Sequence, residues 1–132
     1  DSDGEKVLRQ GISAVPDDAS LYYALGLLQV RKERMAEAVD SLRHATQLAP
    51  ESTQYRYVYA LALQRQGKLA EATGELEDVL ERDAVNRDVR LALIGLYRDQ
   101  DKPDLARVHL TRLREQHPDD PAVQDLWREL NP

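Results

Sequence analysis

The sequence repeats itself with a 34-residue period, and this period constrains the fold more than any other feature of the chain. The rows of matching residues are Ala38, Ala72 and Ala106; Leu42, Leu76 and Leu110; Leu25, Tyr59 and Leu93; and Pro50, Ala84 and Pro118. A register that persists through most of a chain predicts stacked copies of one supersecondary unit. The functional question is then which ligand the stacked surface binds.

Each repeat unit has the pattern of two helices joined by a short polar turn. In the first unit, apolar residues recur at spacings of three and four over residues 19–31 and again over 35–48, which predicts two amphipathic helices. A polar turn lies between them at residues 32–34, and Pro50 ends the unit because proline cannot extend a helix. The other predicted helices cover residues 53–66, 69–82, 87–100 and 103–116, with turns at Gly67-Lys68 and Asp101-Lys102.

Small residues at matched positions predict where the two helices of a unit cross closely. On the second helices these positions are the alanine row named above, where a leucine would force the helices apart. Gly26 and Ala60 are the matching small residues on the first helices. The third unit carries Ile94 there, followed by Gly95, so we expect a shifted or looser contact in that unit.

The register continues past the three full units at both ends. Leu8 lies one full period before Leu42, so residues 5–15 are predicted to be the second helix of an earlier unit. At the other end, a helix is predicted to begin at Pro121 after the cap residue Asp120. This last helix is either a cap or the first half of a fourth repeat. A cap is the prediction, because an uncovered apolar end would face water.

Composition excludes several classes of function. The formal net charge of −6 argues against nucleic acid and anionic membranes as partners, since both attract a basic surface. No apolar run approaches the roughly 20 residues that a membrane-spanning helix needs. The absence of cysteine excludes thiolate chemistry but leaves a cytoplasmic or an exported, periplasmic location open. The start at Asp1, without an initiator methionine, is expected for a piece of a longer protein.

No set of residues has the spacing of a catalytic or metal site. His44, His109 and His117 lack metal-binding spacing, and we interpret them as surface residues of second helices. Five carboxylates between residues 75 and 83 are interpreted as a solvated outer face. The sequence contains no glycine-rich phosphate loop and no Gly-x-Ser-x-Gly nucleophile motif. The prediction is a protein that is not an enzyme and binds no cofactor.

The 34-residue units resemble tetratricopeptide repeats, which have spaced aromatic, Leu, Gly, Tyr, Ala, Phe and Pro positions. The residues that carry the resemblance are Tyr22, Leu25, Gly26, Ala38, Leu42, Ala45 and Pro50 in the first unit; Tyr59, Ala60, Leu63, Ala72, Leu76 and Val79 in the second; and Leu93, Tyr97, Ala106, Leu110, Leu113 and Pro118 in the third. The departures are Gln29, where a tyrosine is usual; Arg56 and Arg90, where a large apolar residue is usual; and Ala84 in place of the closing proline.

The resemblance implies an all-α fold, an α-solenoid of antiparallel helix pairs (a tetratricopeptide repeat, or TPR, superhelix) with a flanking helix at each end. The expected domains are residues 1–18 as the second helix of a partial preceding repeat; 19–52, 53–86 and 87–120 as TPR repeats 1, 2 and 3; and 121–132 as a C-terminal capping helix. Stacks of this kind present extended binding surfaces.

The resemblance also implies that the first helices line a concave groove whose exposed residues select the ligand. The partner-binding residues expected on this face are Tyr23, Leu27, Arg31, Tyr57, Leu61, Arg65, Leu91 and Arg98. They would give the groove an apolar and tyrosine floor with an arginine edge, and arginine binds carboxylates well. The alternative is that Leu27 and Leu61 pack under the next helix, and that Tyr23 and Tyr57 fill gaps between units.

The leading hypothesis is a non-catalytic protein–protein interaction scaffold that binds a peptide or partner segment in this groove. The second hypothesis is a structural spacer or self-association module of a longer protein, with contacts through Leu8, Ile12 or Trp127 of the end helices. A third hypothesis follows from the resemblance to repeats that are appended to bacterial enzymes and multi-haem electron carriers. This chain has no Cys-x-x-Cys-His haem motif, so such chemistry would belong to a missing domain. The Lys, Asn and Arg clamp of chaperone-binding members is absent, so a chaperone tail is not the expected ligand.

Overall fold

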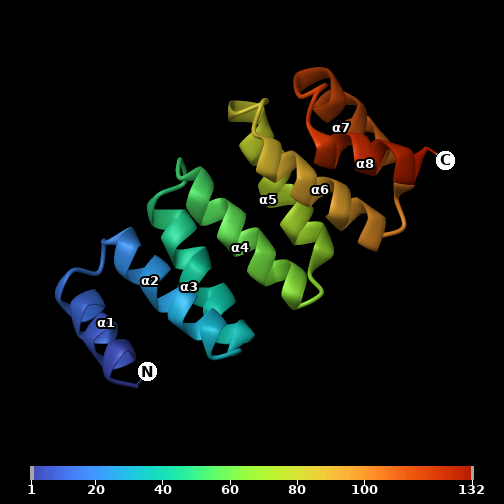
Figure 1. Ribbon diagram of the computed structural model, residues 1–132. Coiled ribbons are helices and arrows are strands. Elements are labelled where there is room, and N and C mark those ends of the chain that lie inside the picture. Colours follow the sequence, from blue (N-terminus) through green and yellow to red (C-terminus); the bar gives the residue numbers. More distant parts are fainter. Residues whose placement is uncertain (1, 132) are drawn as a thin grey trace. The chain divides into compact units, whose positions relative to one another are not determined.

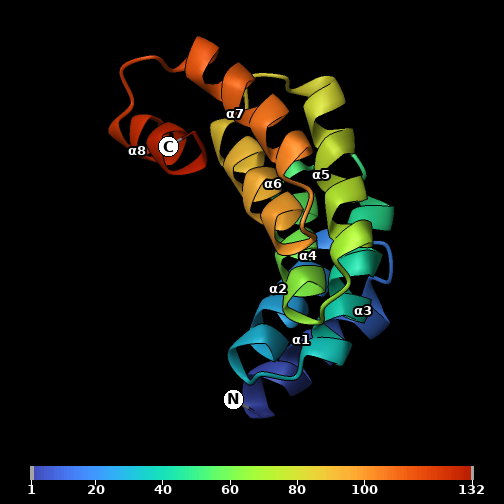
Figure 2. The same ribbon diagram turned by 90° about the vertical axis from the view of Figure 1, so that its right-hand side faces the viewer.

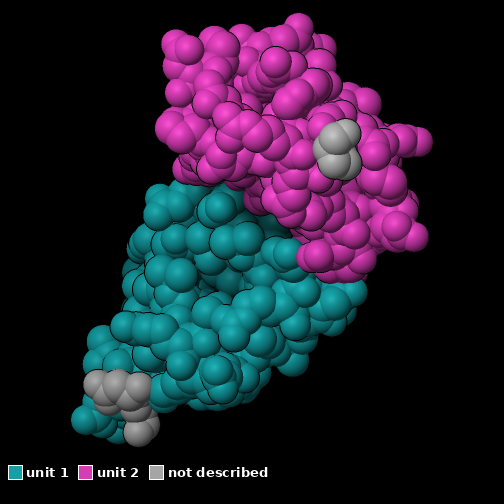
Figure 3. All heavy atoms as spheres, turned by 45° about the vertical axis from the view of Figure 1, so that its right-hand side comes forward, with its two compact units in different colours: residues 1–68 teal, residues 69–132 magenta. Residues whose placement is uncertain are grey.

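The computed structural model describes residues 2–131, which form helices joined by short turns, with no strand among them (Figure 1). The helices are α1 (Ser2–Ala14), α2 (Ala19–Arg31), α3 (Met35–Leu48), α4 (Thr53–Arg65), α5 (Leu69–Arg82), α6 (Arg87–Asp99), α7 (Pro103–Gln116) and α8 (Pro121–Leu130). They form two compact units, unit 1 (Asp1–Lys68) and unit 2 (Leu69–Pro132), shown in Figure 3. The all-helical class predicted from the sequence is confirmed.

The helix bounds follow the predicted ones closely. Those of α2, α3, α5 and α7 are as predicted, whereas α4 and α6 each end one residue early. The reason is that Gln66 and Gln100 are the C-cap residues, and the positive φ angles of the residues that follow them, Gly67 and Asp101, end the helix. Helix α1 starts and ends slightly before the predicted positions.

In unit 1, α2 packs against both α1 and α3, and α3 packs in turn against α4 (Figure 2). The α2–α3 pair is held at a very close approach. A β-carbon on Gly26 would lie only 2.6 Å from Leu42 Cγ. Ala38 and Leu42 are fully buried on the α3 side of this crossing. The predicted close crossing at small residues is therefore confirmed for this helix pair.

In unit 2, α6 packs against α5 and α7, and α8 packs against α7. Ala106 and Leu110 of α7 are fully buried, as the repeat predicts. Ile94 of α6 is also buried, at the position that corresponds to Gly26 of unit 1. A β-carbon on the neighbouring Gly95 would meet no heavy atom within 4 Å. The α6–α7 crossing thus accommodates a branched side chain where the α2–α3 crossing accommodates only glycine.

Three turns show that the 34-residue period of the sequence is also a period of the backbone conformation. Glu33, Gly67 and Asp101 have positive φ angles of 59°, 77° and 56°. In each turn the next N–H donates to a carbonyl oxygen five positions earlier: Arg34 to Gln29, Lys68 to Leu63 and Lys102 to Tyr97. This is the Schellman arrangement, which ends a helix on a left-handed residue. The turns predicted at these positions are confirmed.

The N-cap residues of alternate helices also recur at the repeat spacing. Asp18, Ser52, Asn86 and Asp120 cap α2, α4, α6 and α8, and each side chain accepts a hydrogen bond from a backbone N–H of the first turn. These four residues again follow the 34-residue period, so α8 keeps the register of the first helices. The repeat boundaries, and the assignment of α8 as a cap or as half of a fourth repeat, stay predictions.

The crossing at Gly26 predicts opposite effects of the same substitution at two glycines. Gly26→Ala gains about 1 kcal/mol of helix propensity. It also drives a methyl group into the buried Leu42, and such overpacking costs about 1–3 kcal/mol, so we expect net destabilisation of about 1 kcal/mol. Gly95→Ala meets open space and should stabilise by up to about 1 kcal/mol. Urea unfolding measures both changes, and equal stability of the two variants would contradict the close crossing.

The left-handed turns predict a second set of stability changes. The left-handed conformation costs a residue with a β-carbon about 1–2 kcal/mol, and a substitution by glycine removes this strain. Glycine also has greater freedom in the unfolded chain, which lowers the gain in stability by about 0.4–1 kcal/mol. Glu33→Gly and Asp101→Gly should therefore each raise the free energy of unfolding by up to about 1 kcal/mol. Gly67→Ala, the matched reversal, should lower it by a similar amount. Thermal denaturation tests the set, and destabilisation by both glycine substitutions would rule out strain at these turns.

Candidate functional site

The predicted partner-binding residues of unit 1 lie on one face of each first helix. Tyr23, Leu27 and Arg31 are spaced by four on α2, as are their counterparts Tyr57, Leu61 and Arg65 on α4, so each set lines one side of its helix. Leu27, Arg31 and Arg65 are exposed, and the others are half-buried. We call these six residues the first-helix face.

Tyr23 has a packing role within this face. Its ring stacks on Tyr55 of α4 with a centroid distance of 4.4 Å. Its hydroxyl accepts a hydrogen bond of 3.2 Å from Gln54 Nε2. Tyr23 therefore ties α2 to the first turn of α4, which supports the alternative interpretation of this residue as a filler between helices.

The arginines of the predicted edge differ in their surroundings. Within the described part of the chain, Arg31 and Arg65 form no ion pair, whereas Arg98 Nη2 lies 2.8 Å from Glu129 Oε1 of α8. Arg98 and the half-buried Leu91 belong to α6 of unit 2. The first-helix face of unit 1 thus consists of the six residues on α2 and α4 alone.

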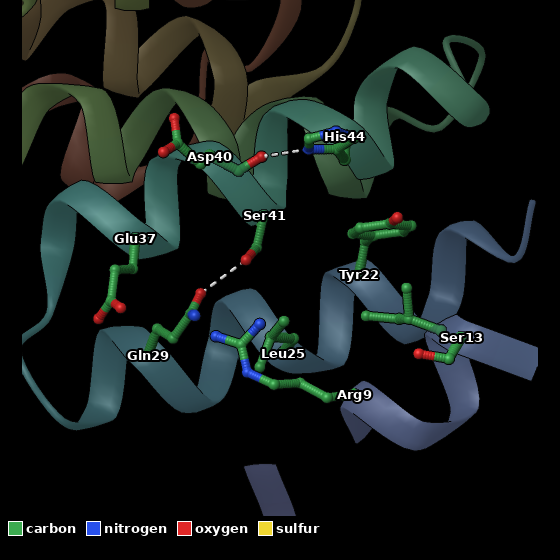
Figure 4. Close-up of a pocket in the computed structure, with 10 residues that line it drawn as sticks. Arg9, Ser13, Tyr22, Leu25, Gln29, Glu37, Asp40, Ser41 and His44 are labelled. Atoms are coloured by element: carbon green, nitrogen blue, oxygen red, sulfur yellow. Dashed lines mark hydrogen bonds between the residues drawn. The ribbon is translucent and has the colours of Figure 1, made fainter. Parts of the chain in front are cut away.

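Unit 1 also contains an open pocket of about 480 Å³ lined by residues of α1, α2 and α3 (Figure 4). The residues that line it are Arg9, Ile12, Ser13, Tyr22, Leu25, Gln29, Glu37, Asp40, Ser41 and His44. Successive residues of a helix are about 100° apart, so Leu25 of the pocket and Leu27 of the first-helix face lie on opposite sides of α2. The sequence did not predict this pocket.

The inner wall of the pocket is polar but almost inaccessible. Gln29 is 1% exposed, and its Oε1 accepts a hydrogen bond of 2.7 Å from Ser41 Oγ. The Gln29 amide nitrogen has no protein acceptor among the described residues. Tyr22 and His44 stack with ring centroids 4.9 Å apart and form an aromatic wall. His44 Nδ1 donates to the Asp40 carbonyl oxygen at 3.0 Å, which leaves Nε2 as an acceptor.

The two carboxylates that line the pocket are each paired with an arginine of their own helix region. Glu37 binds Arg34, and this hydrogen bond holds the pKa of the Glu37 carboxyl below its usual range. Asp40 lies 3.0 Å from Arg43. Arg9 is less tightly held, because its ion pair with Glu5 is 3.5 Å long and its side chain is 55% exposed. Figure 4 shows the Arg9 side chain extending from α1 toward α2.

Unit 2 holds a compact polar cluster that the sequence did not predict. Glu77 Oε2 accepts hydrogen bonds from Tyr97 Oη at 2.6 Å and from His109 Nε2 at 3.2 Å. Arg90 Nη1 donates to His109 Nδ1 at 3.0 Å, and the Tyr97 and His109 rings stack 5.7 Å apart. Because a guanidinium only donates, His109 Nδ1 must accept, so the imidazole proton sits on Nε2 and points to Glu77. Burial raises the pKa of Tyr97 and lowers the pKa of Arg90.

Two interpretations from the sequence are therefore wrong for this cluster. His109 is 8% exposed and is not a surface residue, because both of its ring nitrogens find partners inside unit 2. Glu77 is not part of a purely solvated face, since it receives two of these hydrogen bonds. His44 is exposed as predicted, whereas His117 is half-buried and serves as the C-cap of α7. A signal was available in the sequence, because Tyr97 stands where the first unit has Gln29.

Neither a membrane span nor a metal site adds to these candidates. None of the helices within residues 2–131 has both the length and the apolar character needed to cross a bilayer. In the same part of the chain, no three His, Asp or Glu side chains are placed to hold a metal ion together. The first-helix face and the pocket on the opposite side of α2 are the candidate binding sites of unit 1.

Two family models each match more than half of the sequence. The model described as "Tetratricopeptide repeat" matches residues 63–130. The model described as "Anaphase-promoting complex, cyclosome, subunit 3" matches residues 4–79. No curated protein matches the sequence.

Solved structures share the fold at low sequence identity. A MamA protein has a TM-score of 0.81 and 18% identity, with 89% of this chain and 64% of that chain covered. YrrB, described as a TPR protein with an unusual peptide-binding site, has a TM-score of 0.81 and 22% identity, covering 94% of this chain and 64% of its own. A tetratricopeptide repeat protein from Parabacteroides merdae has a TM-score of 0.86 and 16% identity, with coverage of 96% and 50%.

The chain spans less than two-thirds of the length of each of these three proteins. At such identities the likeness shows the fold, an α-solenoid of helix pairs. Together with the 34-residue register and the family match, it leads to one conclusion: the chain belongs to the tetratricopeptide repeat family.

Proposed function

We propose that this chain is a non-catalytic scaffold whose first-helix face binds an acidic, partly apolar peptide segment of a protein partner. The observation that carries the proposal is the pair Arg31 and Arg65, which are exposed, one repeat period apart and without an ion pair in the described part of the chain. The chain has six more acidic than basic side chains, yet these two arginines remain open. Arginine binds carboxylates with two parallel hydrogen bonds, so an acidic peptide suits this face.

The apolar part of the same face supports a peptide rather than a nucleic acid. Leu27 is 36% exposed beside Arg31, and Leu61 holds the corresponding place on α4. A protein interface commonly combines an apolar centre with aromatic and arginine side chains. The net charge of −6 disfavours a polyphosphate partner, since phosphate backbones need a basic surface.

The comparisons add support at the level of the family. YrrB is described as having a peptide-binding site, and it shares the fold of this chain. The spacer or self-association alternative has less support, because the end residues it invokes are partly covered. Leu8 and Ile12 are half-buried, and the ring of Trp127 lies under Arg114 at 4.2 Å.

Charge reversal on the first-helix face tests the proposal. Acidic peptides are first selected on the wild-type chain from a displayed random library, and their affinities are then measured by fluorescence polarisation. A hydrogen bond to a charged group contributes about 1.5–3 kcal/mol, so Arg31→Glu with Arg65→Glu should weaken binding by at least about a hundredfold. Circular dichroism should remain unchanged, because both side chains are exposed.

The matched control is Arg107→Glu with Arg128→Glu, which makes the same change in net charge on exposed arginines of α7 and α8. These arginines pair only with Asp104 and Asp125 on the surface, where ion pairs contribute little stability. The control should retain the affinity of the wild type apart from a small, salt-dependent loss. Equal affinity of both double variants for every selected peptide would refute the first-helix face as the binding surface.

A further inference from the structure

The pocket of unit 1 and the polar cluster of unit 2 occupy corresponding positions of the repeat. A shift of two repeat periods relates the two sets: Gln29 to Tyr97, Ser41 to His109, Arg9 to Glu77 and Tyr22 to Arg90. The helices correspond as well, because α1, α2 and α3 are related to α5, α6 and α7 by the same shift. Unit 2 therefore shows how this protein fills the space that unit 1 leaves open.

In unit 2 the space is filled by two rings and a carboxylate. Tyr97 and His109 supply the stacked rings, and Glu77 supplies the carboxylate that binds both of them. In unit 1 the ring positions carry Gln29 and Ser41, which have no rings, and both residues line the pocket of about 480 Å³. Pockets of roughly 300–1,000 Å³ are typical of small-ligand sites.

The position that carries the Glu77 carboxylate in unit 2 carries the opposite charge in unit 1. Where α5 carries Glu77, α1 carries Arg9, whose nearest carboxylate, Glu5, is 3.5 Å away and also binds Arg34 at 3.0 Å. A cation in this place cannot accept the hydrogen bonds that Glu77 accepts, and it attracts a carboxylate instead. The Gln29 amide nitrogen is a further donor at the base of the pocket, but Gln29 is only 1% exposed, so Arg9 is the main anchor for a carboxylate.

We propose that the pocket binds the C-terminal aromatic residue of a partner peptide. The ring lies in the pocket next to Gln29 and Ser41, against the aromatic wall of Tyr22 and His44. The terminal carboxylate binds Arg9, the exposed cation that lines the pocket. Glu37 and Asp40 do not oppose the carboxylate strongly, because each is neutralised by its own arginine.

This site is separate from the first-helix face. Its α2 residues lie on the opposite side of that helix, and none of the six residues of the first-helix face lines the pocket. A scaffold with both sites could hold an acidic segment on one side and a chain terminus on the other. The two sites can be tested with different variants, so failure of one proposal leaves the other intact.

The test uses N-acetyl-L-tyrosine, the smallest mimic of a peptide that ends in tyrosine, titrated into the ¹⁵N-labelled chain and followed by amide chemical shifts. We expect saturable shifts at pocket residues such as Gln29, Ser41 and His44. N-acetyl-L-tyrosine amide, which lacks the carboxylate, and N-acetyl-L-leucine, which lacks the ring, should each bind at least tenfold more weakly. Equal binding of either analogue would overturn the proposal, and tighter binding of free L-tyrosine would overturn its assignment to a peptide end.

Two variants localise the binding. Gln29→Tyr installs the residue that the protein already carries at position 97, so it should fill the pocket, keep the fold and abolish the saturable shifts. Arg9→Gln changes an exposed side chain and should weaken N-acetyl-L-tyrosine binding about tenfold while removing the preference over the amide. The first-helix double variant, Arg31→Glu with Arg65→Glu, should bind N-acetyl-L-tyrosine as the wild type does.

Two outcomes would refute the binding of a C-terminal aromatic residue in this pocket, one for each variant. One is unchanged binding by Gln29→Tyr, as judged by the same titration on a variant with wild-type circular dichroism. If Gln29→Tyr does not fold, Arg9→Gln decides alone, because its side chain makes only a long ion pair with Glu5. Undiminished preference of Arg9→Gln for the acid over the amide would then exclude the assigned carboxylate contact.

Discussion

The close crossing of α2 and α3 is the contact on which the rest of unit 1 depends. Gly26 has no β-carbon, so α2 can lie directly against the buried Leu42. This contact fixes which side of α2 turns toward α3. Leu27 then faces outward with the other first-helix residues, and Gln29 faces the pocket. Gly26 therefore orients the α2 residues of both candidate binding surfaces, although it belongs to neither.

The regular turns explain why positions one repeat period apart can be compared directly. Left-handed residues at the three turns and capping side chains at four helix starts recur at the same spacing, so the backbone returns to the same conformation. The energetic cost of Glu33 and Asp101 in this conformation is tolerated because the turn hydrogen bonds are retained. Corresponding positions then have nearly the same backbone conformation and differ mainly in their side chains. Side chains of unit 1 can therefore be compared directly with those of unit 2.

The sequence predicted the helices well because their bounds depend on local signals. Caps, turns and the spacing of apolar residues placed most helix ends within one residue of the observed ones. The buried cluster around His109 was missed because its contacts join three helices, and a histidine on a second helix gives no local sign of burial. The pocket was missed for a related reason: an open space appears only when Gln29 and Ser41 are set against the larger Tyr97 and His109. For the first-helix face, the residues were predicted from the sequence, but the stacking of Tyr23 on Tyr55 was not, because it joins two different helices.

The two ways of occupying this repeat position have different energetic consequences. In unit 2, Arg90 is buried with its Nε unpartnered, and a buried charge costs desolvation that its hydrogen bonds only partly repay. The cluster therefore fixes the packing of α5, α6 and α7 more than it adds stability. Unit 1 avoids that cost by leaving the space open, but it forgoes the contacts that close packing would provide. A ligand that fills the pocket provides those contacts when it binds. The open position in unit 1 therefore favours ligand binding, whereas the filled position in unit 2 favours the packing of its helices.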